Sequence, residues 1–400
     1  MELTSDYPFW SILNGLPTTF PALDRNLSCD VVVIGGGITG ALAAFHLIDA
    51  GVHTVLLEKR DVGTGSTSGS TGLLQYEVDI PLRQLVPRIG AKNAIRSYEL
   101  CGEAVSKLGN LIGKLKIDCG YESKPSLFLA RKADDIRDLR EEYQLRKQIG
   151  FELEFWTQKQ IEHYYPFSRP AALFSRLGGQ VDPHKLTHGL LAAGRRRGLL
   201  VFDRSPVASF KPTRKGICVT TKSGFTVSAR RAVMACGFES MPYLQGQAGR
   251  LKSTYALVSE PVKSFAGWYK RSLIWEAGMP YLYLRTTRDK RIIVGGEDVN
   301  LTSPRRRDRL LPRKTTTLVR KFKTLFPDLE LEVAFSWAGT FGETKDGLAY
   351  IGSNRGLPHA YFALGYGGNG ITYSLVAAEI IRDDFLGRRN RDAHIFRFER

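Results

Sequence analysis

The segment 30–60, DVVVIGGGITGALAAFHLIDAGVHTVLLEKR, decides the fold. Four apolar residues run into a glycine cluster, a helical pattern follows, and a second apolar run ends on a single acid, Glu58. This order predicts a strand, a tight turn, a helix and a second, parallel strand, connected as a right-handed βαβ unit.

The glycine cluster has the spacing G-x-G-x-x-G at Gly35, Gly37 and Gly40, with Ile38 and Thr39 opening the helix. The first glycine permits the tight turn, the second lets the backbone approach a pyrophosphate, and the third allows close packing of helix on sheet. The helix N-terminus then offers free N–H groups to phosphates. Glu58 is placed to accept hydrogen bonds from both ribose hydroxyls, which disfavours NADP and leaves NAD and FAD.

A second loop rich in glycine and hydroxyl groups, GTGSTSGSTG, follows Glu58 closely. An NAD dehydrogenase would usually continue into another helix here. Ser66, Thr67 and Ser68 instead suit a loop that lies along a diphosphate and the edge of a flat ring system. The loop therefore favours FAD, with a flexible surface turn as the alternative.

The composition is that of an ordinary globular chain. Of 400 residues, 43% are hydrophobic and 24% are charged, so we expect two domains. No apolar window suits a membrane span and the first residues do not resemble a secretory signal, which predicts a cytoplasmic protein. Five widely spaced cysteines suggest reduced thiols. The net charge of +17 comes from dispersed runs without a nucleic-acid motif, so we expect a solvated basic surface, with contact to an anionic membrane as the alternative and nucleic acid disfavoured.

The pattern along the chain predicts interleaved domains. Residues 91–115 and 133–149 have helical spacing, residues 217–237 suggest a small antiparallel excursion that returns to the main sheet, and residues 251–300 suggest an antiparallel sheet. The tail reads as a strand, a glycine turn and an apolar helix. We expect a discontinuous nucleotide-binding domain (25–84, 175–245 and 335–390), a substrate domain (85–174 and 246–334), an N-terminal extension (1–24) and a C-terminal tail (391–400).

Several motifs in this order resemble one family. They are DVVVIGGGITGALAAFHL with LLEKR, GSTSGSTG, GGQVDPHKL, VMACGFES, WAGTFGETKDGLAYIG and YFALGYGGNGITYS. The chain resembles the FAD-dependent oxidoreductases of the D-amino-acid oxidase type, which include glycine, sarcosine and γ-glutamylputrescine oxidases. The resemblance implies an α/β plus α+β fold, in which an interrupted Rossmann-like FAD-binding domain adjoins a substrate domain built on an antiparallel sheet.

The resemblance also implies the cofactor contacts. A helix N-terminus at the last glycine turn would stabilise the negative charge that reduced flavin gathers around N1 and O2. The cysteine that sarcosine oxidases use for covalent attachment falls near Gly339, which implies noncovalent FAD. The implied cofactor residues are Gly35, Gly37, Ile38, Thr39, Gly40, Glu58, Lys59, Ser66, Thr67, Ser68, Val207, Ala235, Gly237, Gly339, Gly367, Gly368, Asn369, Gly370 and Ile371.

The implied reaction is oxidation of a C–N bond in an amine or amino acid by hydride transfer to flavin N5, after which the imine hydrolyses. Oxygen or a quinone would accept the electrons. Three alternatives remain: a quinone- or dye-linked amine or amino-acid dehydrogenase, an FAD-dependent C–OH dehydrogenase of the polyol-phosphate type, and a non-enzymatic flavin-binding scaffold for anionic partners.

The chain departs from the family where a substrate carboxylate would be held. Gly72, Phe341 and Thr372 stand at positions where relatives carry an arginine or a lysine, so the familiar carboxylate clamp is missing. The lysine that assists reaction with oxygen is replaced by Ile293, which weakens the prediction of an oxidase.

Other residues are candidates for the substrate pocket. Arg285 could hold an anion, with Tyr281 and Tyr283 on the same strand face, or it could be an ordinary sheet-surface arginine. Glu77 could attract a cationic amine or could pair with an arginine. No metal site is predicted, because no third ligand accompanies the His184 and His188 pair. The pocket candidates are Arg285, Tyr283, Tyr281, Gln75, Glu77, Tyr366 and Phe341.

Overall fold

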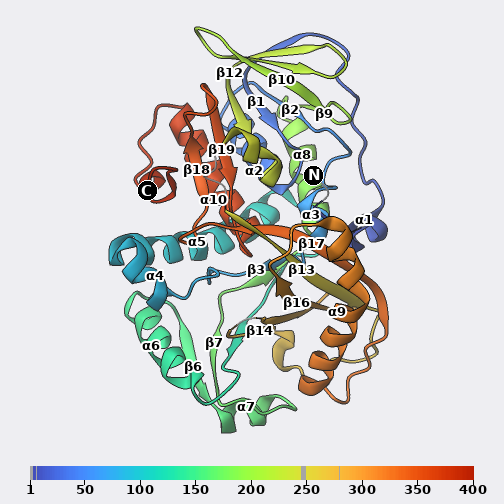
Figure 1. The fold of residues 1–400 in the computed structure, drawn as a ribbon, viewed down its shortest axis with the longest axis vertical. Helices are drawn as coiled ribbons and strands as arrows, with labels where there is room; N and C mark the ends of the chain where they lie inside the picture. The colour runs from blue at the N-terminus through green and yellow to red at the C-terminus, as the bar shows by residue number, and fades with distance from the viewer. Residues whose placement is uncertain (1–2, 6, 245–248, 279) are drawn as a thin grey trace.

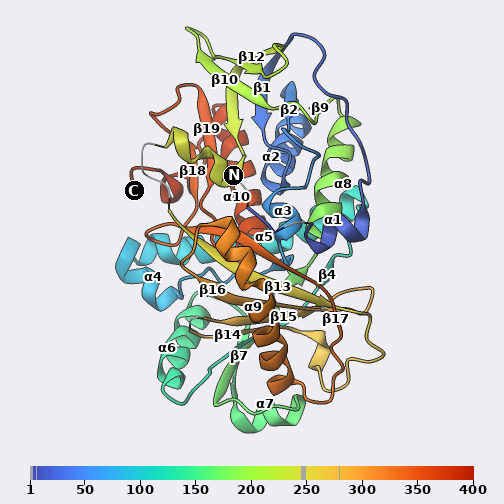
Figure 2. The ribbon, with the colours of Figure 1, turned by 45° about the vertical axis from the view of Figure 1, so that its right-hand side comes forward.

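Two large sheets form the framework of the computed structural model, which describes residues 3–5, 7–244, 249–278 and 280–400. The β10–β12 region lies at one end of the molecule, and the helices α6 and α7 lie at the other (Figures 1 and 2). The first sheet has the order β10-β11-β12-β1-β2-β9, and β19 pairs with both β12 and β18. Its strands are β1 (Leu27–Ile34), β2 (Thr54–Leu57), β9 (Leu200–Phe202), β10 (Val207–Pro212), β11 (Ile217–Thr221), β12 (Thr226–Met234), β18 (Tyr350–Ser353) and β19 (Ala360–Leu364).

The centre of the first sheet is parallel, as the βαβ pattern predicts. β1 pairs in parallel with β2 on one side and with β12 on the other, and β12 pairs in parallel with β19. The excursion through β10 and β11 is antiparallel and returns to the sheet through β12. Segments from the start, middle and end of the chain therefore meet in one sheet.

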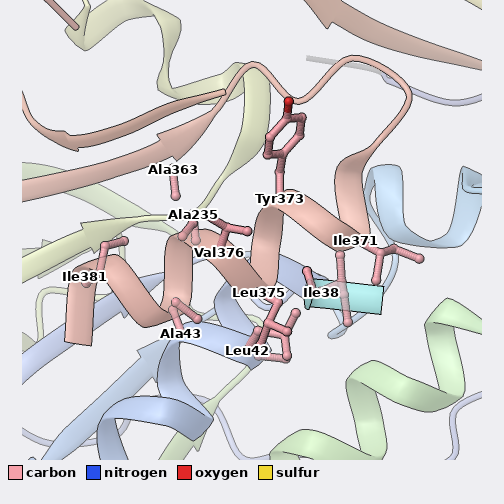
Figure 3. Packing of buried hydrophobic residues seen from close by; sticks show 14 of the residues in the cluster. Ile38, Leu42, Ala43, Ala235, Ala363, Ile371, Tyr373, Leu375, Val376 and Ile381 are labelled. Atoms are coloured by element: carbon pink, nitrogen blue, oxygen red, sulfur yellow. The ribbon is translucent and has the colours of Figure 1, made fainter. Parts of the chain in front are cut away.

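Helices α2 (Ile38–Asp49), α5 (Ala91–Leu115), α8 (Pro183–Arg195) and α10 (Gly370–Phe385) share the largest apolar core with this sheet. Leu42 of α2 lies beside Leu375 of α10, and Val376 of α10 lies beside Ala235 (Figure 3). The small residues of α2 allow the helix to approach closely. A fully buried leucine such as Leu42 contributes about 1.5–3 kcal/mol, so this contact holds the two helix N-termini firmly in place.

The second large sheet has the order β17-β13-β16-β15-β14-β5-β7-β6, in which only the β14–β5 pair is parallel. One face of this sheet packs on α9 (Pro304–Leu325), and Leu318, Phe322 and Leu325 of the helix make the contact. Its strands are β5 (Ser126–Leu129), β6 (Leu153–Thr157), β7 (Ala171–Ser175), β13 (Arg250–Ser259), β14 (Leu273–Glu276), β15 (Leu282–Thr286), β16 (Ile292–Val299) and β17 (Val333–Glu343).

The remaining elements are short or peripheral. A three-stranded sheet has the order β3-β8-β4. Among the helices of the described residues, none has the length and hydropathy of a membrane span. These elements are α1 (Phe9–Asn14), α3 (Ser66–Gly69), α4 (Leu82–Ile89), α6 (Asp135–Gln148), α7 (Gln158–Tyr164), β3 (Leu73–Leu74), β4 (Glu122–Ser123) and β8 (Gly179–Gln180), with 3-10 turns at Gly237–Tyr243, Tyr269–Arg271 and Ala393–Phe396.

The arrangement confirms the predicted fold class, but it differs from the predicted domain boundaries in two places. β17 was assigned to the nucleotide-binding domain from residue 335, whereas its entire length pairs with β13 in the second sheet. α5 was assigned to the substrate domain, whereas it packs in the core of α2 and α10. Both differences arise because strand pairing and helix packing partners are distant in sequence and leave no local pattern.

The N-terminal segment is bound to the second sheet. Thr4 bridges Gly339 of β17, the Ser5 N–H donates to the Ala338 carbonyl at 2.9 Å, and the Thr340 N–H donates to the Leu3 carbonyl at 2.7 Å. Leu3, Thr4 and Ser5 of the predicted N-terminal extension therefore form a short antiparallel ladder at the edge of β17.

Candidate active site

One cavity of about 800 Å³ has walls from both large sheets. Its described lining comes from the glycine turn after β1, the loop after β2, the crossover after β12, one face of the second sheet and the turn before α10. The structure thus brings together segments that lie more than 300 residues apart in the chain.

The glycine turn after β1 requires glycine for steric reasons. Gly35 has φ +111°, and a Cβ there would lie 2.6 Å from the Ala235 carbonyl oxygen. A Cβ on Gly40 would lie 1.8 Å from the Gly35 carbonyl oxygen. Gly40 therefore serves helix packing and lies outside the cavity lining, whereas Gly35, Gly37, Ile38 and Thr39 line it.

Glu58 fixes the glycine turn against the end of β2. Its Oε2 accepts from the Gly36 N–H at 2.7 Å, and its Oε1 accepts from the Arg60 N–H at 2.8 Å. Burial raises the pKa of Glu58, and these two backbone hydrogen bonds oppose that shift. The neighbouring Lys59 pairs with Glu239 at 2.6 Å. The carboxylate thus lies at the cavity wall and is already oriented by backbone donors.

The loop after β2 contains a single helical turn, α3, where the sequence predicts a loop. Ser66 and Thr67 line the cavity, and Thr67 Oγ1 accepts from the Ile38 N–H at 2.9 Å. Ser68 is buried outside the lining and donates to the Gly65 carbonyl at 2.9 Å. Ser68 therefore shapes the turn, and the prediction that it contacts the cofactor directly disagrees with its position.

The turn before α10 is held by the segment after β3. Asn369 donates through Nδ2 to the carbonyls of Glu77 at 2.8 Å and Gln75 at 3.2 Å. The Gly368 N–H donates to Asp79 Oδ2 at 2.8 Å. The other predicted cofactor residues also line the cavity, namely Glu58, Lys59, Val207, Ala235, Gly237, Gly339, Gly367, Gly368, Asn369, Gly370 and Ile371.

Six of the seven pocket candidates line the same cavity: Gln75, Glu77, Tyr281, Tyr283, Phe341 and Tyr366. Arg285 is the exception. Its guanidinium is buried and donates to the carbonyls of Gly72 at 2.9 Å and Val181 at 3.1 Å. Arg285 is therefore neither a sheet-surface residue nor part of the described cavity lining, and the prediction that it anchors a substrate anion disagrees with this position.

Glu77 lies in a buried ion-pair network. Its Oε1 is 3.3 Å from Arg146, which also pairs with Glu142 at 2.7 Å. The sequence allows Glu77 to attract a cationic amine or to pair with an arginine, and the structure favours the pair with an arginine. Glu77 Oε2, however, has no hydrogen-bond partner among the described residues.

Sequence reasoning missed several residues of the wall. Asp79 and Asp298 line the cavity, as do Thr254, Phe128 and Trp275. Asp79 follows Glu77 by two residues, a spacing that could have drawn attention to it. The others come from strands whose pairing across the sheet the sequence does not reveal.

The cavity fits FAD on observations of the structure itself. A glycine turn that tolerates no side chain leads into the N-terminus of α2, and a second glycine turn leads into the N-terminus of α10. Both helix starts border the cavity and suit anionic or electron-rich groups. The predicted FAD residues would hold the cofactor along this path, with Glu58 at the adenosine end.

Known proteins with similar sequences and structures agree with this geometry. The γ-glutamylputrescine oxidoreductase of Escherichia coli (strain K12) is 26% identical over 402 residues, covering 98% of this chain and 91% of the relative. The crystal structure of glycine oxidase from Geobacillus kaustophilus has a TM-score of 0.75 at 20% identity, covering 92% and 96% of the two chains. L-amino acid deaminase from Proteus vulgaris has a TM-score of 0.77 at 17% identity, covering 96% and 99%.

The family described as "DAO: FAD dependent oxidoreductase" matches residues 30–383. This match includes both glycine turns, Glu58 and nearly all of the cavity wall. The predicted resemblance and the predicted cofactor are thereby confirmed, and the chain belongs to the family of FAD-dependent oxidoreductases.

Proposed function

We propose that this chain oxidises the C–N bond of an amine or amino acid with noncovalently bound FAD. The carrying observation is that one cavity runs from the glycine turn after β1 to a polar and aromatic face of the second sheet. The names of the similar oxidoreductase, oxidase and deaminase support the same bond type. Bound FAD supplies a hydride acceptor, and the imine left behind hydrolyses in water.

The chain's own groups orient the reactants and exclude water. Burial raises the pKa of Tyr281 and Tyr283 well above the usual range of a phenol. Both side chains therefore remain protonated at neutral pH and serve as hydrogen-bond donors and as cavity walls, rather than as bases. Phe341, at the position of the missing clamp, supplies apolar surface.

Noncovalent binding follows from the side chains at the wall. Gly339 occupies the position near which covalent members carry a cysteine, and Cys236 is the one cysteine in the described lining. Burial raises the pKa of the Cys236 thiol to about 11, so the reactive thiolate is scarce at neutral pH. Release of the yellow colour on acid precipitation tests this point, and flavin that stays with the precipitated protein would contradict it.

An anaerobic panel tests the reaction. Primary amines, secondary amines, amino acids of both hands and hydroxy acids are mixed in turn with the flavin-loaded protein, and flavin absorbance is followed. We expect bleaching by at least one amine or amino acid. Bleaching by hydroxy acids or polyol phosphates alone would favour the C–OH alternative and overturn the proposal.

The electron acceptor is proposed from the environment of Ile293. This side chain is fully buried beneath α1, in a cluster with Phe9, Trp10 and Trp337. The chain thus lacks the lysine that assists reaction with oxygen, which favours a quinone or dye over oxygen. Stopped-flow mixing of photoreduced flavin with oxygen tests this assignment. Rapid reoxidation of the flavin would indicate an oxidase instead.

We also propose that the basic surface includes a site for an anionic membrane. Five exposed arginines lie on α9, at positions 305, 306, 309, 313 and 320. Co-sedimentation with phosphatidylserine vesicles at low and moderate salt tests the contact, and phosphatidylcholine vesicles provide the control. Equal binding to both kinds of vesicle would contradict it.

A further inference from the structure

The cavity carries a recognition site for a cationic amine that lacks a carboxylate. We propose that Asp298 and Asp79 hold the positive group of the substrate, so that these two acids replace the arginine clamp used for amino acids. This inference rests on the proposed C–N oxidation and adds the substrate class.

A β-bulge directs Asp298 into the cavity. β16 pairs with β13 through Tyr255–Gly296 and next through Ser253–Val299, so β16 carries one extra residue at this point. Residues Ile292 and Val294 face α9 in the apolar core. Regular alternation would also turn Asp298 towards α9. The extra residue reverses this alternation, so that Asp298 lines the cavity.

The neighbouring residue, Glu297, has a strained backbone conformation in this bulge. Glu297 has φ +58°, a left-handed conformation that is uncommon for a residue with a side chain. Its carboxylate faces α9 and pairs with Lys314 at 3.0 Å and with Lys321. Two ion pairs therefore hold the strained residue of the bulge, and the bulge presents Asp298 to the opposite face of the sheet.

Asp298 is buried without a partner. Its residue exposure is 9%, and neither carboxylate oxygen has a hydrogen-bond partner among the described residues. The Thr254 and Tyr281 hydroxyls lie near enough to lower its pKa, but burial raises the pKa by more. The two hydroxyls thus offset only part of the cost of burying this carboxylate, and a cationic ligand would offset the rest.

The surrounding charge favours a cation. Besides Glu58 and Glu239, the described lining carries the acids Glu77, Asp79, Glu276 and Asp298. Glu276 is paired with Arg169 at 3.0 Å, whereas no ion pair to Asp79 or Asp298 is found among the described residues. Arg146 also lines the cavity, and Glu142 and Glu77 already neutralise it. Lys252 lowers the pKa of Asp79 and Asp298 but is itself paired with Glu343 at 2.7 Å.

Aromatic rings complete the site. Phe128 and Trp275 stack with centroids 3.8 Å apart, and the Tyr281 and Tyr283 rings lie 6.3 Å apart on the adjacent strand region. All four residues line the cavity. Rings of this kind bind the alkyl groups of an ammonium ion by apolar contact and by cation–π attraction.

A carboxylate has no comparable anchor. Arg285 donates to the Gly72 and Val181 carbonyls and lies outside the described lining. Gly72, Phe341 and Thr372 supply no positive charge at the positions of the family clamp. An α-carboxylate would therefore find no cation at the positions where other family members offer one, and it would share the cavity with the acids Asp79 and Asp298.

Binding of two non-oxidisable probes to the flavin-loaded protein tests the site. Benzyltrimethylammonium has no N–H, and benzoate is an anion of similar shape. Flavin difference absorbance and calorimetry give the dissociation constant of each. We expect the cation to bind, benzoate to bind at least about tenfold more weakly, and Asp298→Asn to weaken the cation about tenfold or more.

The variants keep this test independent of folding and of catalysis. Asp79→Asn provides a second removal of negative charge, and Asp328→Asn makes the same change on an exposed residue outside the site. Tighter binding of benzoate, or equal effects of Asp298→Asn and Asp328→Asn, would overturn the proposed site. If the cation binds as expected but no amine or amino acid bleaches the flavin, the proposed function fails instead.

Discussion

At the scale of single residues, Glu58 determines how firmly the adenosine end of the cofactor is held. Its carboxylate is oriented by the Gly36 and Arg60 N–H groups. Glu58→Ala removes both bonds and the proposed ribose acceptor, so the dissociation constant for FAD should rise about tenfold or more. Fluorescence titration of apoprotein with FAD measures it, with the exposed Glu141→Ala as control. Similar constants for the two variants would show that Glu58 does not contact the cofactor.

The substitution Gly40→Ala tests how closely α2 packs on the glycine turn that follows β1. Because a Cβ at this position would lie 1.8 Å from the Gly35 carbonyl oxygen, Gly40→Ala must displace the turn or the helix. We expect loss of FAD and a destabilisation of about 1–3 kcal/mol by urea unfolding. Gly113→Ala, in α5 with no atom within 4 Å of the new Cβ, should leave stability equal or slightly higher. Equal stabilities of the two variants would contradict the packing argument.

The sequence identified the residues that carry a local pattern. Gly35, Gly37 and Glu58 were found because the cofactor turn depends on spacing within one βαβ unit. Asp298 was missed because its direction depends on an extra residue in β16, which only the pairing with β13 reveals. Arg285 was misplaced for a related reason: alternation gave its strand face, but the carbonyls that bind it come from segments 104 and 213 residues away.

At the scale of elements, the short helix α1 supports the loop after β2. Trp10 is 3% exposed, and its Nε1 donates to the Ser70 carbonyl at 2.7 Å. Trp10→Ala should destabilise the protein by about 3–5 kcal/mol, since it removes a large buried side chain and releases this loop. Urea unfolding measures the change. Ile12→Ala, on the same helix but 45% exposed, should cost far less. Equal losses of unfolding free energy in the two variants would contradict the role of the buried Trp10 contacts in supporting the loop.

Predictability also differed among the elements. The helix predicted at 91–115 is observed as α5 with the same bounds, because its periodicity is long and regular. The edge ladder of Leu3–Ser5 on β17 was not predicted, since two or three residues carry no period and the partner strand is more than 300 residues away. Local pattern therefore fixed helices and the parallel core, while edges and bulges depended on tertiary contacts.

At the scale of the whole molecule, the chain crosses between the two sheets several times, and the cavity exists only where these crossings meet. Asp79 illustrates the consequence. The surrounding protein raises its pKa to about 7 by desolvation, and the Gly368 N–H opposes this shift. Glu343 of β17 and Asp298 of β16 contribute smaller increases to this value, while Lys252 of β13 lowers it. Four segments from different parts of the chain thus set one titration.

This titration predicts how the affinity for a cation depends on pH. Below about pH 7 Asp79 is protonated in the free protein, and a cation must displace that proton in order to gain the charge. The affinity for benzyltrimethylammonium should therefore rise as the pH increases through 7 and level off above it. The probe has no titratable proton, so the pH dependence belongs to the protein. In Asp79→Asn the rise should shrink to what Asp298, whose pKa burial also raises, supplies. An unchanged profile would assign the titration to another group.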